Sequence, residues 1–381
     1  MKWISFLLIL LFLTGCAAPP PAEPLPEASI STVPTQPEPT SAPTETEPPD
    51  PILVLVNTMT VDERVGQLFL ARCSAETALA DIETYHLGGF VLFAKNFENE
   101  TVDSIRQTLS GYQSAAKIPM LLAVDEEGGT VTRISCFPAF RSEKFYSPRS
   151  LYDWGGQDAV LTVEEEKCQL LQSLGLNVNL GPVCDITTDS GAFMYRRSLG
   201  QDAKTTANVV SAQVMLMNAY SIGSVLKHFP GYGNNSDTHT GLARDSRSLE
   251  ELESRDLIPF SAGMDAGCGA VLVSHTIVEA LDDTLPASLS PAVHRYLRQT
   301  MGFDGVILTD DLVMQAISDQ YGAGEAAVMA VQAGNDLLCS TNYPEQYTAV
   351  LNAVLDGRID FDQLNESVTR VLKWKQSLGL I

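Results

Sequence analysis

Residues 227–239 read KHFPGYGNNSDTH and combine ionisable side chains with loop-forming residues. Asp237 and His239 stand two positions apart. A carboxylate beside an imidazole orients the ring and stabilises its protonated form, as a general acid and base requires. Gly231 and Gly233 tolerate positive φ angles and favour a flexible loop over a helix. Most Asp-x-His pairs in loops are only solvated surface groups, so a catalytic role depends on other reactive residues nearby.

Several more ionisable residues stand at or just beyond the ends of short apolar segments. Helix capping accounts for one or two such residues, but not for a whole set of carboxylates, imidazoles and an ammonium group. A buried strand that ends in charged residues delivers them to a rim, where they meet residues from neighbouring strands. The set comprises Asp125, Asp185, Lys227, His228, His275, Asp310 and Asp311.

The apolar segments alternate along the chain with segments of helical periodicity. Strands that alternate with helices form a parallel sheet, and eight such strands close it into an α/β fold, the (β/α)8 TIM-type barrel. The carboxyl ends of all strands then meet at one rim, where active sites lie. The expected strands are 67–71, 88–93, 120–125, 176–181, 224–228, 270–275, 305–310 and 336–340, and the clearest helices are 103–116, 203–220, 291–301 and 324–333.

The amino-terminal region predicts an anchor and a spacer. Residues 1–15 are apolar after one Lys, and Leu-Thr-Gly precedes Cys16, which resembles a bacterial lipoprotein signal with cleavage before Cys16 and acylation of its thiol. An ordinary signal peptide or an uncleaved anchor is the alternative. Residues 16–51 are rich in Pro, Thr and Glu and predict a disordered tether. Residues 52–381 show no second Pro-rich break and predict one domain.

Charge and cysteine usage exclude several classes of partner. The chain has 47 acidic and 24 basic residues, and its net charge of −23 argues against nucleic acid or an anionic membrane surface as a partner. The cysteines beyond Cys16 lack CxxC or metal-ligand spacing, so we expect buried thiols and no metal site, although an extracytoplasmic location leaves disulfide pairing open. They stand at positions 73, 136, 168, 184, 268 and 339.

Longer motifs give the chain a family resemblance. From residue 52 to residue 381 it resembles the β-N-acetylglucosaminidase (β-hexosaminidase) branch of glycoside hydrolase family 3. Together these motifs are specific, and they imply a retaining glycosidase on a single barrel. The matching motifs are MTVDERVGQLF (59–69), VDEEGGTVTR (124–133), LNVNLGPVCDI (176–186), RSLG (197–200), KHFPGYG with DTH (227–239), and PASLSP through TDDLVMQAI (286–317).

The resemblance implies a role for each catalytic candidate. Asp310, the first Asp of the TDDLVM motif, would be the nucleophile that forms a covalent glycosyl-enzyme, and Asp311 its neighbour. His239 would be the acid and base with Asp237 as its partner. A histidine suits both half-reactions because it donates a proton when charged and accepts one when neutral.

The remaining matches imply sugar recognition without a cofactor. Asp125, Arg197, Lys227 and His228 correspond to residues that bind the hydroxyl and N-acetyl groups of the terminal sugar. Arg133 and Asp185 are expected to support the rim, and His275 either to support the site or to contact the substrate. Neither protonation nor attack by a carboxylate calls for a metal or an organic cofactor.

Two features set this chain apart within the resemblance. The family loop usually reads PGHG followed by an acidic residue, whereas Tyr232 and Asn234 stand here, which predicts altered loop geometry or leaving-group preference. The chain also ends at Ile381, directly after the expected last barrel helix. We therefore expect the acid to come from the barrel loop and not from a second domain, as in the larger β-glucosidases of the family.

The leading hypothesis is a membrane-anchored, extracytoplasmic exo-β-N-acetylglucosaminidase that acts on peptidoglycan fragments or related glycans. A phosphorylase is an alternative, because a neutral histidine does not repel an approaching phosphate. A β-glucosidase and an inactive glycan-binding lipoprotein are further alternatives. Turnover of aryl glycosides and the products formed in phosphate buffer distinguish these four.

Overall fold

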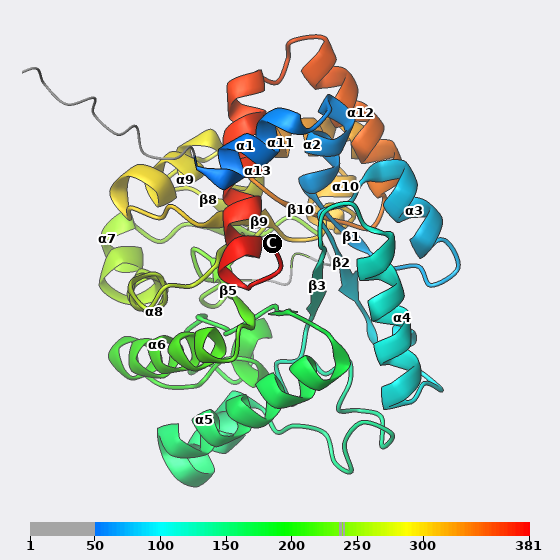
Figure 1. Cartoon of the computed structure of the whole chain (residues 1–381). Helices are drawn as coiled ribbons and strands as arrows, with labels where there is room; N and C mark the ends of the chain where they lie inside the picture. Colours follow the sequence, from blue (N-terminus) through cyan, green and yellow to red (C-terminus); the bar gives the residue numbers. More distant parts are fainter. Residues whose placement is uncertain (1–49, 236–237, 239–240) are drawn as a thin grey trace, which may run out of the picture. The chain divides into compact units, whose positions relative to one another are not determined.

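The computed structural model describes residues 50–235, 238 and 241–381 (Figure 1). Cys16, the predicted signal peptide and the predicted tether up to residue 49 lie outside these residues, and so do Asp237 and His239.

The folded domain begins within the last two residues assigned to the tether. Helix α1 spans Pro51–Thr58, and the side chain of Asp50 accepts a hydrogen bond from the Ile52 backbone N–H at 2.9 Å. An Asp at the N-cap followed by Pro in the first turn is a strong helix start. Asp50 also lies 3.4 Å from the ammonium group of Lys373 on the last helix.

The sheet is the predicted eight-stranded parallel barrel. The strands are hydrogen-bonded in the order β10-β1-β2-β3-β4-β5-β7-β9, and a parallel bridge between Leu308 and Leu337 joins β9 to β10. Each of the eight predicted apolar segments overlaps one of these strands, and β1 and β5 extend one residue beyond the predicted bounds, β5 at both ends. Their bounds are β1 Phe69–Arg72, β2 Gly89–Leu92, β3 Leu121–Val124, β4 Val178–Asn179, β5 Gly223–Phe229, β7 Ala270–Val273, β9 Val306–Thr309 and β10 Leu338–Ser340. Two short strands that were not predicted, β6 (Arg244–Asp245) and β8 (Ile277–Val278), pair with each other.

The strands alternate between two apolar environments. In β3, Leu121 and Ala123 belong to the cluster inside the barrel, whereas Leu122 and Val124 pack in the cluster that contains the helices. Because both faces are buried, strand sequences of this kind are apolar throughout and do not alternate with polar residues. This double burial explains why the apolar segments were visible in the sequence.

Helices surround the sheet and include the four segments predicted from periodicity. These correspond to α4, α6, α9 with the π-helical turn η6, and α11. The α-helices after α1 are α2 Val61–Gln67, α3 Ala78–Tyr85, α4 Val102–Ala115, α5 Pro148–Leu174, α6 Ala203–Ala219, α7 Leu249–Glu251, α8 Leu257–Asp265, α9 Pro291–Arg295, α10 Gln315–Ser318, α11 Ala323–Ala333, α12 Tyr343–Leu355 and α13 Phe361–Ser377. The 3-10 and π turns are η1 Ala94–Asn96, η2 Phe193–Arg196, η4 Leu252–Asp256, η5 Ala287–Leu289 and η6 Tyr296–Thr300.

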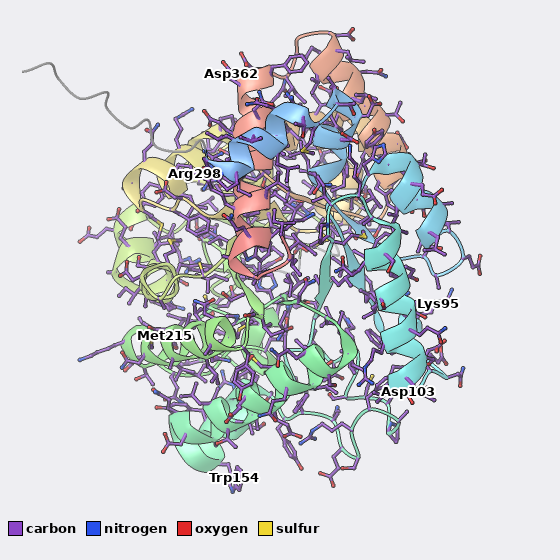
Figure 2. The ribbon with its side chains drawn as sticks, in the orientation of Figure 1. Lys95, Asp103, Trp154, Met215, Arg298 and Asp362 are labelled. Carbon is purple, nitrogen blue, oxygen red and sulfur yellow. The ribbon has the colours of Figure 1, made fainter. Side chains whose placement is uncertain are left out.

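Helix α5 contains a break that divides it in two. Gly155 and Gly156 have non-helical backbone angles, and Gly156 has a positive φ of 64°, which favours glycine. Trp154, directly before the break, is 83% exposed and projects from the surface (Figure 2). The first part of α5 is therefore short, because it begins at Pro148 and ends at this break.

The last helix closes the amino-terminal end of the barrel. Trp374 of α13 packs in the interior cluster, and its indole ring lies where side chains on Gly223 and Gly269 would be. A Cβ atom on Gly269 would lie 1.9 Å from the Trp374 Nε1 atom, so glycine is required there. With this end filled, the carboxyl ends of the strands are the part of the barrel open to a ligand.

Two further observations concern membrane-spanning helices and thiols. Within the described part of the chain, no helix has the length and apolarity needed to cross a membrane. The six cysteines beyond Cys16 are free, and five of them are buried, as the sequence predicts, whereas Cys136 is exposed.

Candidate active site

A cleft of about 770 Å³ opens at the carboxyl ends of the strands. Asp125 follows β3, Lys227 lies in β5 and Asp310 follows β9, so strands far apart in the sequence bring these three side chains to one rim. The predicted site residues that line the cleft are Asp125, Arg133, Arg197, Lys227, His228, Asp310 and Asp311. Asp185 and His275 are buried and are not among the lining residues.

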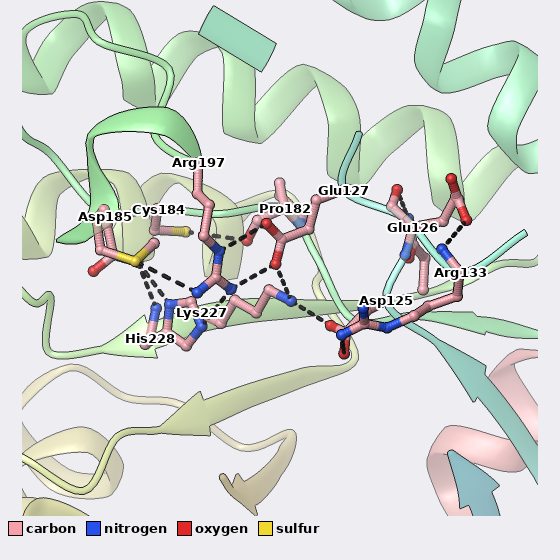
Figure 3. A network of polar contacts seen from close by, with 12 residues as sticks. Asp125, Glu126, Glu127, Arg133, Pro182, Cys184, Asp185, Arg197, Lys227 and His228 are labelled. Atoms are coloured by element: carbon pink, nitrogen blue, oxygen red, sulfur yellow. Dashed lines mark hydrogen bonds and ion pairs between the residues drawn. The ribbon is translucent and has the colours of Figure 1, made fainter. Parts of the chain in front are cut away.

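Lys227 connects two carboxylates at one side of the cleft. Its ammonium group lies 2.6 Å from Asp125 Oδ1 and 2.7 Å from Glu127 Oε1 (Figure 3). The Lys227 side chain is only 2% exposed, and burial alone would lower its pKa. The two carboxylates outweigh burial and raise the pKa of Lys227 above its ordinary value, so this lysine is charged.

Arg197 binds the same glutamate through two parallel hydrogen bonds. Its Nε donates to Glu127 Oε2 at 3.0 Å, and one terminal nitrogen donates to Glu127 Oε1 at 2.7 Å. Burial would raise the pKa of Glu127, but the charges of Arg197 and Lys227 hold that pKa well below its usual range. Glu127 is therefore an ionised carboxylate that fixes two cations, and such fork-like pairs are geometrically specific.

The protonation pattern of His228 follows from its two partners. The guanidinium of Arg197 donates to His228 Nε2 at 3.0 Å, so Nε2 is the accepting nitrogen. The proton then lies on Nδ1, which donates to Asp185 Oδ2 at 2.8 Å. Asp185 also accepts from the backbone N–H of His228 at 3.1 Å, and its other oxygen accepts from the backbone N–H of Tyr232 at 2.7 Å. Asp185 is thus bonded to the backbone and ring of His228 and to the backbone of Tyr232.

Asp310 and Asp311 have different surroundings although they are adjacent. Asp310 lines the cleft, and its Oδ1 accepts from the Asp311 backbone N–H at 2.8 Å. The Asp311 carboxylate accepts from the Thr341 hydroxyl at 2.5 Å and from the Thr341 backbone N–H at 3.1 Å. Burial raises the pKa of Asp311, which these two bonds oppose. Asp311 therefore ties the end of β9 to the segment after β10, whereas the bond from the Asp311 backbone to Asp310 is local to the cleft lining.

His275 supports the backbone beside Asp310. It is fully buried, its Nε2 donates to the Asp311 carbonyl at 3.0 Å, and Nδ1 lies 2.7 Å from the hydroxyl of Ser288. Of the two roles expected for this residue, the arrangement favours support over substrate contact.

Arg133 is another arginine beside the cleft. Its guanidinium is 3.8 Å from Asp125 Oδ2 and stands over the Phe93 ring at 5.4 Å. Arg72 stands over the same ring at 4.3 Å. Arg133 thus pairs with an acid, as expected of a supporting residue, and it also lines the cleft.

The loop that follows β5 is held by contacts at Gly231 and at Tyr232. Arg247 donates to the Gly231 carbonyl at 2.9 Å and pairs with Asp245 and Asp256 at 2.5 and 2.7 Å. Tyr232 is 1% exposed, and its hydroxyl lies 2.6 Å from the Thr238 hydroxyl. The expected dyad of the loop, Asp237 and His239, lies outside the described residues.

The most important residue of the charged network that the sequence did not reveal is Glu127, which is buried beneath the cleft lining. It stands two positions after Asp125 within the quoted VDEEGG motif, and this proximity was the only available signal. Glu126, between them, has its oxygens bound by the Arg133 and Ile134 backbone N–H groups and the Ser135 hydroxyl, so it stabilises the loop. Phe93 and Phe193, which line the cleft together with Tyr232, carried no sequence signal. Within the described ranges no group of three or more His, Cys, Asp or Glu side chains is arranged to hold a metal ion.

Two curated relatives share the sequence of the barrel. A β-hexosaminidase of Stenotrophomonas maltophilia (strain R551-3) is 32% identical over 305 residues, which are 77% of this chain and 86% of the relative. β-Hexosaminidase A of Pseudoalteromonas piscicida is 30% identical over 325 residues, which are 78% of this chain and 54% of the relative. This chain therefore spans about half the length of the second protein.

A solved structure and a family model agree with these relatives. The structure of a glycoside hydrolase family 3 β-N-acetylglucosaminidase from Paenibacillus sp. str. FPU-7 matches with a TM-score of 0.79 and 31% identity, covering 85% of this chain and 63% of that one. Residues 60–374 match the model described as the glycosyl hydrolase family 3 N terminal domain. By this match, and with a barrel whose cleft is lined by Asp310, Arg197 and Lys227, the chain belongs to glycosyl hydrolase family 3, a family of glycoside hydrolases.

Proposed function

We propose that the protein is a retaining exo-β-N-acetylglucosaminidase that releases terminal β-linked N-acetylglucosamine. The observation that carries the proposal is the position of Asp310 at the end of β9, in the same cleft as a preorganised set of charged hydrogen-bonding groups. The names of the hexosaminidase relatives and of the Paenibacillus enzyme support the choice of sugar.

In the first half-reaction Asp310 attacks the anomeric carbon while the glycosidic oxygen receives a proton. A carboxylate is sufficient as the nucleophile because the sugar already carries positive character at that carbon in the transition state. The bond to the leaving oxygen breaks, and a covalent glycosyl-enzyme forms on Asp310. His239, supported by Asp237, would supply the proton to the leaving oxygen.

In the second half-reaction the same histidine, now neutral, would remove a proton from water. The water attacks the anomeric carbon and releases Asp310, which restores the enzyme and retains the β configuration. One imidazole can serve both steps because its ordinary pKa lies close to neutral pH.

Asp125, Arg197, Lys227 and His228 would hold the sugar during both steps. The hydroxyl groups of a sugar are both donors and acceptors, and this set offers a carboxylate, two cations and an imidazole within one bonded network. Because Glu127 and Asp185 already fix these groups, little reorganisation is needed when the sugar binds. Each buried group left unpaired would cost about 1–3 kcal/mol, so a ligand lacking the matching groups binds more weakly.

The protein would act outside the cytoplasm, on a lipid anchor. Acylation of Cys16 and a Pro-rich tether of residues 16–49 would hold the barrel away from the membrane surface. Peptidoglycan fragments and related glycans are the β-linked N-acetylglucosamine compounds available at such a location.

The test is hydrolysis of two aryl glycosides by residues 50–381. We expect turnover of the aryl β-N-acetylglucosaminide and not of the aryl β-glucoside. Asp310→Ala should lower kcat/KM by at least about 10³-fold and His239→Ala by about 10²-fold or more. Turnover of the glucoside alone would show that the sugar is wrong. Release of a sugar 1-phosphate in phosphate buffer would identify a phosphorylase, and no turnover of either by the folded domain would favour a glycan-binding protein.

A further inference from the structure

Arg149 lies in the first turn of α5 and has no role in the proposed reaction. A cation in the first turn of a helix opposes the helix dipole, so the stability of α5 gives no reason for an arginine at this position. Its guanidinium stands over the Tyr195 ring, with 4.0 Å between the guanidinium carbon and the ring centroid. This stacking fixes the plane of the guanidinium, and with it the directions in which its N–H groups donate.

The hydrogen bonds of Arg149 hold the segment that follows β4. Its Nε donates to the Tyr195 carbonyl at 2.9 Å. One terminal nitrogen donates to the Thr187 carbonyl at 2.9 Å and to the Ser198 hydroxyl at 3.1 Å. A Cβ atom on Gly200 would lie 2.2 Å from the guanidinium carbon, so this close approach requires glycine there. Arg149 therefore fixes the chain at three points between residues 187 and 198, and none of the three acceptors is charged.

Two of these points lie on either side of Arg197. Tyr195 stands two positions before it, and Ser198 follows it directly. The guanidinium of Arg197 lines the cleft and donates to His228 Nε2 at 3.0 Å (Figure 3). Because Arg149 holds the chain before and after Arg197, it restricts where that guanidinium can lie.

The third point lies close in sequence to the other partner of His228. Thr187 stands two positions after Asp185, whose carboxylate accepts from His228 Nδ1 at 2.8 Å. The imidazole is thus held between two groups, and Arg149 bonds to the chain near each of them. The hydrogen bond that one ring nitrogen makes determines which nitrogen carries the proton, so the tautomer of His228 depends on these two neighbours.

We propose that Arg149 is a positioning residue for sugar recognition: its guanidinium fixes the chain that carries Asp185 and Arg197, and thereby the orientation and tautomer of His228. Arg149 is not among the residues that line the cleft, so it acts through these neighbours. A displacement of about 1 Å in a positioned group lowers activity by up to about 100-fold. The inference rests on the proposed function, in which Arg197 and His228 bind the terminal sugar.

The experiment uses variants of the full chain. Arg149→Met removes the three hydrogen bonds, and Ser198→Ala removes one acceptor. Circular dichroism shows whether each variant folds, and Ser198→Ala keeps the inference testable if Arg149→Met does not. Arg141→Met is the matched control, because Arg141 also stands over an aromatic ring, Phe145 at 4.3 Å, and bonds to Glu166 of α5 at 2.8 Å, but does not line the cleft.

The first measurement is competitive inhibition by N-acetylglucosamine during turnover of an aryl β-N-acetylglucosaminide. We expect Arg149→Met to raise Ki by about 10- to 100-fold, because the groups that bind the sugar are displaced. Ser198→Ala should raise Ki by about 2- to 10-fold, since it removes one hydrogen bond of the three. Arg141→Met should leave Ki unchanged.

The second measurement does not depend on catalysis. The ring-nitrogen NMR signals of His228 in protein made with labelled histidine, assigned by their loss in His228→Gln, report which nitrogen carries the proton. In the parent we expect the proton on Nδ1 and not on Nε2. Arg149→Met, and to a smaller extent Ser198→Ala, should shift both signals towards a mixture of tautomers. Arg141→Met should leave the signals as in the parent.

Three results would overturn the inference. A parental Ki, or parental ring signals of His228, in folded Arg149→Met or in its substitute Ser198→Ala would show that Arg149 does not position the site. Similar changes in Arg141→Met would show that any loosening beside α5 has this effect. If the parent turned over no aryl glycoside, the proposed function would fail, whereas the ring signals would still decide whether Arg149 sets the tautomer of His228.

Discussion

At the scale of single residues, the site depends on Glu127. This carboxylate lies between the guanidinium of Arg197 and the ammonium of Lys227 and is itself buried. A buried ion pair contributes little net stability when complete, but removing one partner leaves the others buried and uncompensated. Glu127 is thus a residue whose loss should affect both folding and sugar binding.

We predict that Glu127→Gln lowers the free energy of unfolding by about 3–5 kcal/mol at pH 7, because Arg197 loses the carboxylate that it pairs with and Lys227 keeps only one of its two carboxylates, Asp125. It should also lower kcat/KM for the aryl β-N-acetylglucosaminide by at least about 10-fold, an effect of roughly 1.4 kcal/mol. Urea unfolding measures the change in the free energy of unfolding, and steady-state kinetics measure the change in kcat/KM.

Asp336→Asn is the control for Glu127→Gln, since Asp336 is buried and pairs with Arg298 and Arg370 and does not line the cleft. It should destabilise the fold while kcat/KM stays unchanged. A Glu127→Gln enzyme with parental kcat/KM would contradict the prediction.

The same residue predicts a pH effect. The pKa of Glu127 is lower in the folded state than its unfolded value of about 4.3. The unfolded chain therefore binds more protons in acid, so the stability from Glu127 is present above that pH and is lost as the pH falls through the folded pKa. We expect the stability difference between parent and Glu127→Gln to be constant from pH 6 to 8 and to shrink below about pH 4. A difference that grows in acid would contradict the assignment.

At the scale of elements, the barrel depends on the fit between α13 and the starts of the strands. Gly269 precedes β7, and a Cβ at this position would fall within the Trp374 indole. Gly111 in α4 differs, because a Cβ there would meet nothing within 4 Å. Overpacking of a buried contact is destabilising, whereas Ala replaces Gly favourably in an open helix.

We therefore predict opposite effects for two Gly→Ala changes. Gly269→Ala should lower the free energy of unfolding by about 1–3 kcal/mol or more, and Gly111→Ala should raise it by about 0.5–1 kcal/mol. Urea denaturation of each variant beside the parent measures the shift in midpoint. Equal effects of the two changes would contradict the packing of Trp374 against the strand starts.

The loop after β5 is the second element with a testable anchor. Arg247 donates to the Gly231 carbonyl and holds Asp245 and Asp256, so its fork-shaped guanidinium connects three groups. A lysine at this position would keep the positive charge but could not bond to all three groups at once, as the planar guanidinium does.

We expect Arg247→Lys to lower kcat/KM by about 3- to 10-fold, a loss of roughly 0.7–1.4 kcal/mol of transition-state stabilisation. Arg244→Lys is the control, because Arg244 is half-exposed and pairs with Glu279. Parental kinetics in Arg247→Lys would show that this anchor does not influence the site.

At the scale of the whole molecule, the barrel could be predicted from sequence because its strands are buried on both faces. The eight apolar segments and the polar residues at their ends were therefore visible without any contact information. The partners of those polar residues were not visible, because Glu127 meets Arg197 and Lys227 across 70 and 100 positions of sequence. The break in α5 depends on Gly155 and Gly156 within an otherwise helical segment, and a glycine pair alone does not distinguish a break from a helix end.

The packing of α13 against the barrel also buries one ionisable side chain, Lys375, that has no role in the proposed reaction. Lys375 of α13 is fully buried, and its ammonium group donates to Gln67 Oε1 at 2.6 Å. Among the described residues no carboxylate forms an ion pair with it. Burial lowers the pKa of Lys375 to about 7. Folding therefore disfavours the protonated form of this lysine, unlike that of Lys227 in the cleft.

The final prediction concerns stability and pH. The folded pKa of Lys375, about 7, lies below the unfolded value of about 10.4, so the unfolded chain binds more protons between these pH values and stability rises with pH across that interval. Lys375→Met should raise the free energy of unfolding at pH 7 by about 1–3 kcal/mol and remove this rise. Urea unfolding from pH 7 to pH 10, followed by circular dichroism, measures the difference from the parent. Lys373→Met, two positions away and exposed, should leave the pH dependence unchanged. A less stable Lys375→Met protein at pH 7 would show that the bond to Gln67 outweighs the cost of burying the charge.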